Sequence, residues 1–155
     1  MIKSIFSNKC LLLLGSGELG KEISIESQRL GCKIIAVDKY PNAPAMQVAD
    51  ESIVLNMGDK DSLKNLILKL KPDFVIPEIE AISIEALKEI EEEGIKVVPN
   101  ARTVEMTMNR DKIRDLAATE LEINTANYKY VFKEENLKND ALIIGFPLIL
   151  KPLMS

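Results

Sequence analysis

Short apolar runs alternate with longer amphipathic segments along the first hundred or so residues. The apolar runs predict strands over 11–14, 33–37, 52–55, 73–76 and 95–98. Between them, apolar residues recur at helical spacing, which predicts helices over 18–30, 59–70 and 83–93. Apolar strands that alternate with helices are typical of a parallel sheet covered on both faces, so we expect a doubly wound α/β domain.

The pattern changes beyond that point. It predicts a helix over 109–119, a strand-like segment over 128–132, a helix over 134–143 and a strand over 147–151. The last apolar stretch runs to Ser155 with no closing helix. We therefore expect the chain to stop inside a second domain.

Composition narrows the function classes. Hydrophobic residues make up 46% and charged residues 28% of the 155 residues, as in a globular protein. The net charge of −4 indicates no nucleic-acid partner, which would need a clustered basic face. No segment is apolar for long enough to span a membrane, so we expect a cytoplasmic protein with no membrane partner.

The chain has few residues suited to metal binding or nucleophilic catalysis. Cys10 and Cys32 each begin an apolar run, and we expect buried thiols in a reducing compartment. The absence of histidine excludes a Ser-His-Asp triad and a histidine metal site within the chain. The acidic residues show no metal-ligand spacing, so we predict no catalytic residue and no metal site here.

Residues 15–20 read G-x-G-x-x-G between a predicted strand and helix. Gly15 permits a tight turn, Gly17 lets a ligand approach the backbone, and Gly20 lets the helix pack closely on the strand. The amides that begin the helix favour an anion. Asp38 stands where a dinucleotide-binding domain carries its ribose-binding acid. The motif alone leaves open a dinucleotide, another phosphate-bearing ligand, or backbone packing without a ligand.

Glu18 argues against the dinucleotide. Its carboxylate lies in the first turn of the helix, where it suits the helix dipole but would repel a pyrophosphate. A ligand with an amine near its phosphate or ribose fits better. The plainer alternative is an acid that only stabilises the helix dipole.

Six stretches then follow one another in a characteristic order: LLLLGSGELGKEISIESQRLG, IIAVDKYPNAPAM, FVIPEIEAI, EEEGIKVVPNAR, TMNRDKIRDLAA and FPLILKPLMS. Together they resemble the formate-dependent phosphoribosylglycinamide formyltransferases of the ATP-grasp superfamily, over nearly the whole chain. The motifs GSGELGKE, IPEIEAI and MTMNR are more specific than the glycine pattern alone.

The resemblance implies a Rossmann-like substrate-binding (pre-ATP-grasp) domain over 1–107 and the start of an ATP-grasp domain over 108–155. Such enzymes use ATP to convert formate to formyl phosphate, and the amine of glycinamide ribonucleotide attacks it in purine synthesis. The implied partners are glycinamide ribonucleotide, formate and ATP with Mg²⁺, in a homodimer. The magnesium ligands and a glycine-rich phosphate loop are expected beyond LKPLMS, so we expect the chain alone to be inactive.

The resemblance also assigns residues. Glu18 and Leu19 match a substrate-contacting pair, and Glu78 matches a further substrate-contacting carboxylate. Arg110 and Lys151 match ATP-contacting residues.

Each assignment has a plainer alternative. Glu78 can be a solvated acid, with Glu80 equally placed at the same edge. Arg110 can form a surface ion pair with Asp111, and Lys151 can be an ordinary strand-end lysine.

Two other functions compete with the formyltransferase. Carboxylases of aminoimidazole ribonucleotide share the superfamily, but their glycine loops differ from GSGELGKE. A stand-alone NAD-binding module would need Asp38 on a ribose and would give Arg110 and Lys151 no role.

Overall fold

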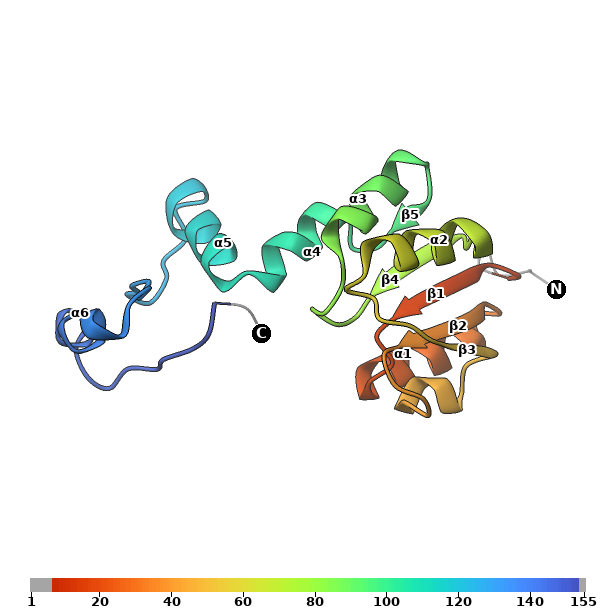
Figure 1. The fold of residues 1–155 in the computed structure, drawn as a ribbon, viewed down its shortest axis with the longest axis horizontal. Helices are drawn as coiled ribbons and strands as arrows, with labels where there is room; N and C mark the ends of the chain where they lie inside the picture. The colour runs from red at the N-terminus through yellow and green to blue at the C-terminus, as the bar shows by residue number, and fades with distance from the viewer. Residues whose placement is uncertain (1–6, 154–155) are drawn as a thin grey trace. The chain divides into compact units, whose positions relative to one another are not determined.

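The computed structural model describes residues 7–153. It divides into two compact units, the first ending at Glu105 and the second beginning at Met106, which are treated separately below. The first unit is built on a parallel five-stranded sheet in the order β3-β2-β1-β4-β5 (Figure 1). The predicted doubly wound α/β class is confirmed.

All five predicted strands are present, with ends that differ by at most one residue. They are β1 (Cys10–Leu14), β2 (Lys33–Asp38), β3 (Glu51–Val54), β4 (Phe74–Pro77) and β5 (Lys96–Val97). The helices are α1 (Glu18–Arg29), the 3₁₀ turn η1 (Pro44–Gln47), α2 (Lys60–Leu70), α3 (Ile84–Glu92) and α4 (Ala101–Met108).

Helix α4 was not predicted, because the expected helix begins only at residue 109. The signal was present in Asn100, whose Oδ1 accepts a hydrogen bond from the Thr103 amide at 2.8 Å. A side chain that accepts from the third residue of a helix is a typical N-cap. Asp59 and Ser83 do the same for α2 and α3.

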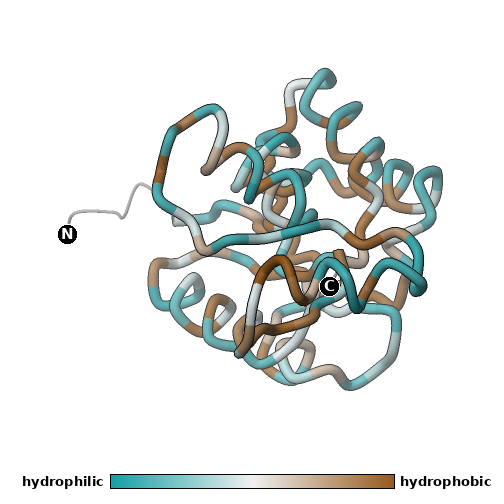
Figure 2. The backbone as a smooth tube through the Cα atoms, turned by 90° about the vertical axis from the view of Figure 1, so that its left-hand side faces the viewer, coloured by the Kyte–Doolittle hydropathy of each residue, from teal (hydrophilic) through white to brown (hydrophobic). Residues whose placement is uncertain are grey.

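The core of the first unit surrounds β1, the central strand. Helix α1 covers one face of the sheet, and α2 and α3 cover the other (Figure 1). Leu13 packs with Ala36 and Ala45 on the α1 side, and both Leu12 and Leu14 are fully shielded from solvent. The helices alternate hydrophobic and hydrophilic residues along their length (Figure 2). Burial on both faces explains why β1 is apolar throughout, since each buried leucine contributes about 1.5–3 kcal/mol.

The second unit contains α5 (Arg110–Asp115), the π-helical turn η2 (Leu116–Glu120), the 3₁₀ turn η3 (Glu134–Asn136) and α6 (Leu137–Ile144). The helices predicted over 109–119 and 134–143 are therefore confirmed. The strands predicted over 128–132 and 147–151 are wrong, because neither segment pairs with a strand.

The alternation that suggested the first of these strands has another cause. The hydroxyls of Tyr128 and Tyr130 both donate to Asp115 Oδ1, each at 2.8 Å, so the alternate positions bind a helix end and not a sheet. In the second segment, Ile149 and Leu150 are exposed. None of residues 109–153 is fully buried, which leaves these apolar runs without a strand to pair with.

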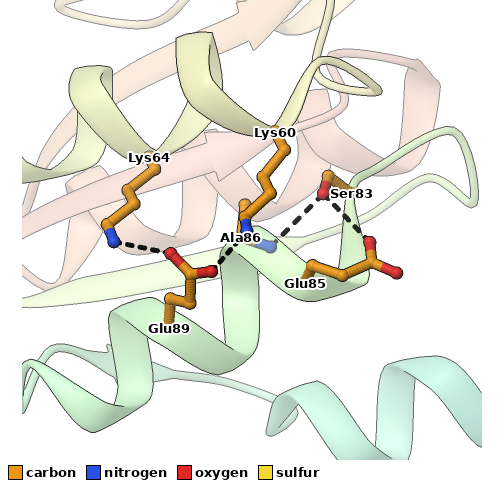
Figure 3. Close-up of polar contacts among 6 residues, drawn as sticks. All are labelled: Lys60, Lys64, Ser83, Glu85, Ala86 and Glu89. Atoms are coloured by element: carbon orange, nitrogen blue, oxygen red, sulfur yellow. Dashed lines mark hydrogen bonds and ion pairs between the residues drawn. The ribbon is translucent and has the colours of Figure 1, made fainter.

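A charged cluster joins α2 to α3 in the first unit. The Glu89 carboxylate contacts Lys60 Nζ and Lys64 Nζ, each at 2.5 Å (Figure 3). Hydrogen bonds from Lys60 and then Lys64 lower the pKa of Glu89 from 4.5 to about 2. The cluster therefore favours the folded state whenever Glu89 is ionised.

We predict that Glu89→Gln lowers the free energy of unfolding at pH 7. The folded-state pKa is depressed, so the contribution is complete above the unfolded value of 4.5 and is lost as pH falls toward 2. Urea unfolding followed by circular dichroism at several pH values measures the difference from wild type. Glu92→Gln, an exposed position on the same helix, is the control. A difference that persists unchanged at pH 2, or an equal loss in the control, contradicts the prediction.

Candidate functional site

The glycine loop joins β1 to α1, and its shape requires glycine at two positions. Gly15 has φ +107°, and a Cβ there would lie 2.5 Å from Glu78 Oε2 and 2.6 Å from Ile79 Cγ2. A Cβ at Gly20 would lie 3.0 Å from the Gly15 carbonyl oxygen. Gly15 also donates its amide to the Val37 carbonyl at 3.0 Å, which ties the turn to β2. The first and third glycines of the motif therefore serve the backbone itself.

Ser16, the residue after Gly15, is held in place by three hydrogen bonds. It is fully buried, and its amide donates to Asp38 Oδ2 at 2.8 Å. Its hydroxyl donates to the Val37 carbonyl at 3.0 Å, and its own carbonyl accepts from the Ala45 amide at 2.9 Å. The sequence analysis did not single out Ser16, because the motif treats this position as variable.

Asp38 has a different role from the one that the spacing suggested. Its second oxygen, Oδ1, accepts from the Lys39 amide at 2.7 Å, so both oxygens bind backbone. The residue is only 4% exposed. This arrangement argues against the ribose contact that an NAD-binding module would need.

Glu78 lies directly after β4 and reaches the other side of the loop. Its amide donates to the Leu14 carbonyl at 2.8 Å, and its carboxylate lies beside the backbone of Gly15 and Gly17. Oε2 is buried and has no hydrogen-bond partner among the described residues. Burial, and to a lesser extent the charge of Asp38, raises the pKa of Glu78. An unpartnered buried oxygen of this kind is suited to a ligand that donates a hydrogen bond.

The first turn of α1 completes this edge. Glu18 is exposed, and Leu19 is 63% exposed. The first intrahelical bond is donated by Lys21 to the Gly17 carbonyl at 3.0 Å, so the amides of Glu18 and Leu19 precede it. Both residues and Glu78 lie at the carboxyl ends of the parallel strands, the edge at which such sheets bind ligands.

The two predicted ATP-contacting residues lie in the second unit. The Arg110 side chain donates to the Pro152 carbonyl at 2.8 Å, and its amide donates to the Leu153 carbonyl at 3.0 Å. Lys151, one residue before Pro152, is exposed. The structure thus brings Arg110 to the segment that carries Lys151. Asp111, the ion-pair partner considered above, instead accepts from the Lys112 amide at 2.8 Å.

Other kinds of site find little support in the described chain. Cys10 is partly buried, Cys32 is buried, neither is in a disulfide, and burial raises the pKa of both thiols. Within residues 7–153, no three His, Cys, Asp or Glu side chains are grouped so that they could hold a metal ion. None of the helices in that range is both long and apolar enough to cross a membrane.

Comparison with known proteins agrees with this geometry. Residues 9–108 match the ribonucleotide synthetase preATP-grasp domain. The chain belongs to this family. The match covers all five strands and the glycine loop of the preATP-grasp domain, and ends at the last residue of α4.

Individual relatives are similar over most of the chain. This chain is 66% identical over 155 residues to the formate-dependent phosphoribosylglycinamide formyltransferase of Prochlorococcus marinus (strain MIT 9312). The alignment covers all of this chain and 40% of the relative. A structure named glycinamide-RNase-transformylase T, from Mycobacterium tuberculosis, is 42% identical with a TM-score of 0.75, covering 77% of this chain and 37% of the other. An ADP complex of an N5-carboxyaminoimidazole ribonucleotide synthetase is 26% identical with a TM-score of 0.79, and the match covers 95% of this chain and 38% of the synthetase.

We predict that Gly15→Ala destabilises the preATP-grasp domain more than Gly94→Ala does. Both glycines have positive φ, +107° and +83°, but a Cβ at Gly94 meets nothing within 4 Å. Left-handed backbone alone costs about 1–2 kcal/mol, and the contact with Glu78 and Ile79 adds about 1–3 kcal/mol for Gly15→Ala. Urea unfolding of the two variants measures both costs. Equal losses would show that Glu78 moves aside freely.

Proposed function

We propose that this chain is the amino-terminal part of a formate-dependent phosphoribosylglycinamide formyltransferase. The observation that carries the proposal is 66% identity, across all 155 residues, to a relative of that name. In this proposal, residues 1–107 form the substrate-binding domain and 108–155 begin the ATP-grasp domain. The family match, which ends at residue 108, supports the boundary between the two domains.

The proposed enzyme uses ATP to activate formate as formyl phosphate and formylates the amine of glycinamide ribonucleotide in purine biosynthesis. We expect it to act as a cytoplasmic homodimer. The chain itself contributes the acidic edge at the glycine loop and the two cations of the second unit.

The acidic edge is suited to the ribonucleotide. Glu78 Oε2 is buried with no hydrogen-bond partner in the described part of the chain, and Glu18 is the exposed carboxylate at the start of α1. The amine and ribose hydroxyls of glycinamide ribonucleotide donate hydrogen bonds, and bonds from such donors to carboxylates are stronger than neutral ones. We therefore assign substrate binding to Glu18, Leu19 and Glu78.

The second unit is suited to ATP. Arg110 and the segment of Lys151 are joined by the hydrogen bonds to Pro152 and Leu153, and two cations fit a nucleotide phosphate. A related synthetase is described in complex with ADP, which supports nucleotide binding in this superfamily. The proposal includes Mg²⁺, whose ligands are expected outside this chain, as the family resemblance implies.

The competing carboxylase of aminoimidazole ribonucleotide shares the fold. Its representative reaches a TM-score of 0.79, but at 26% identity, against 42% for the transformylase structure. The identities favour the formyltransferase.

We predict that Glu78→Gln raises the KM for glycinamide ribonucleotide about tenfold to a hundredfold, since a hydrogen bond to a charged group contributes about 1.5–3 kcal/mol. The KM for ATP should change less than about twofold. The test protein is a chimaera that joins this chain to the carboxy-terminal remainder of the Prochlorococcus relative. Glu80→Gln, exposed and two residues away, is the control. A larger effect in the control, or equal changes for both substrates, contradicts the assignment.

The same variant has a pH signature. Donors on the ligand favour the ionised carboxylate, whereas burial raises the pKa of Glu78 in the free protein. The KM for glycinamide ribonucleotide should therefore fall as pH rises through the pKa of Glu78. Glu78→Gln should remove that inflection, and its persistence in the variant would assign the titration to another group.

For the nucleotide site, we predict that Lys151→Met in the chimaera raises the KM for ATP about tenfold and leaves the KM for glycinamide ribonucleotide within about twofold. Lys138→Met changes another exposed lysine of the second unit and is the control. Steady-state kinetics with each substrate varied in turn measures both constants. An unchanged KM for ATP would show that Lys151 is an ordinary surface lysine with no role in ATP binding.

A further inference from the structure

Two carboxylates flank the glycine loop. The Ser16 amide donates to Asp38, the last residue of β2, at 2.8 Å, and the carboxylate of Glu78, directly after β4, lies beside Gly15 and Gly17. These two strands flank β1, so the loop that follows β1 has a carboxylate on each side. The domain thus supplies its own anion to an amide that, in a G-x-G-x-x-G loop, would otherwise bind a phosphate.

The two carboxylates differ in what they leave for a ligand. Glu78 Oε2 is buried with no hydrogen-bond partner among residues 7–153, whereas Asp38 uses Oδ2 on Ser16 and Oδ1 on Lys39. An ionised carboxylate accepts with both oxygens, but an asparagine amide has one acceptor and one donor end. A carboxylate can therefore accept from both amides at once, and an asparagine at this position can accept from only one of them.

We propose that Asp38 is a positioning residue for the ligand site and does not bind the ligand itself. By holding the Ser16 amide, it fixes the loop from which α1 begins, and so fixes Glu18 and Leu19 opposite Glu78. That the ligand is glycinamide ribonucleotide rests on the proposed function. The hydrogen bonds that Asp38 accepts are observed independently of that function.

Asp50 is a suitable control for Asp38, because it accepts a backbone hydrogen bond at the opposite end of β2. Asp50 Oδ2 accepts from the Ile34 amide at 2.7 Å, near the start of β2 and away from the glycine loop. Asp50→Asn therefore perturbs a carboxylate-to-backbone hydrogen bond of the same kind and leaves Ser16 untouched. This control variant distinguishes a general loss of stability from a change in the position of the glycine loop.

The first measurement is amide hydrogen exchange of the 155-residue chain by NMR. Asp38→Ala should speed exchange at Ser16 about tenfold or more, because the amide loses its charged acceptor, and Asp50→Asn should not. Asp38→Asn, which preserves the shape of the side chain, should speed exchange at Ser16 or Lys39 and serves if the alanine variant does not fold. Exchange at both amides that matches wild type in both Asp38 variants would overturn the inference.

The second measurement uses the chimaera. Asp38→Asn should raise the KM for glycinamide ribonucleotide about tenfold while kcat and the KM for ATP change less than about twofold. Asp50→Asn should lower the melting temperature without changing that KM. Equal KM values in the two variants would show that Asp38 is merely structural and overturn the inference.

Failure of the proposed function has a different signature. A wild-type chimaera that did not formylate glycinamide ribonucleotide would contradict the function, whatever the exchange data show. Saturable NADH binding by the wild-type chain that Asp38→Asn abolishes would overturn the positioning role itself, because Asp38 would then contact a ligand.

Discussion

The hydrogen bond from the Ser16 amide to Asp38 Oδ2 fixes the loop between β1 and α1. Because β1 is the central strand, the loop that follows it lies between the ends of β2 and β4, and each neighbour supplies one carboxylate. A loop held by this hydrogen bond and flanked on both sides has few alternative conformations. The start of α1, and with it Glu18, therefore has a defined position before any ligand arrives.

This arrangement concentrates negative charge where hydration is poor. The loop amides and the positive end of the α1 dipole offset part of that cost. Asp38 has a backbone donor on each oxygen, whereas Glu78 Oε2 has none among the described residues. An unsatisfied buried acceptor costs about 1–3 kcal/mol. In the proposed function, a ligand that donates to Oε2 recovers that free energy on binding.

The parts of the fold that the sequence predicts well are those where one physical cause produces one pattern. Burial on both faces makes β1 apolar throughout, and side-chain caps such as Asp59 precede the helices. Prediction fails where two causes produce the same pattern. Tyr128 and Tyr130 alternate as strand residues do, but they do so to reach Asp115. The spacing of Asp38 likewise places an acid near the loop without revealing which atoms its oxygens bind.

The hydrogen bonds of Asp38 bear on which of two ligand classes a G-x-G-x-x-G loop can bind. A pyrophosphate needs loop amides that are open to solvent and a strand-end acid that is open to a ribose. Here both Asp38 oxygens accept from backbone amides, so this acid is not open to a ribose, and Glu18 and Glu80 are exposed carboxylates at the same edge. Their negative charge disfavours a pyrophosphate and, in the proposed function, favours a ligand that carries an amine. The groups bonded to the loop amides, more than the spacing of the glycines, determine which ligand such a loop can accept.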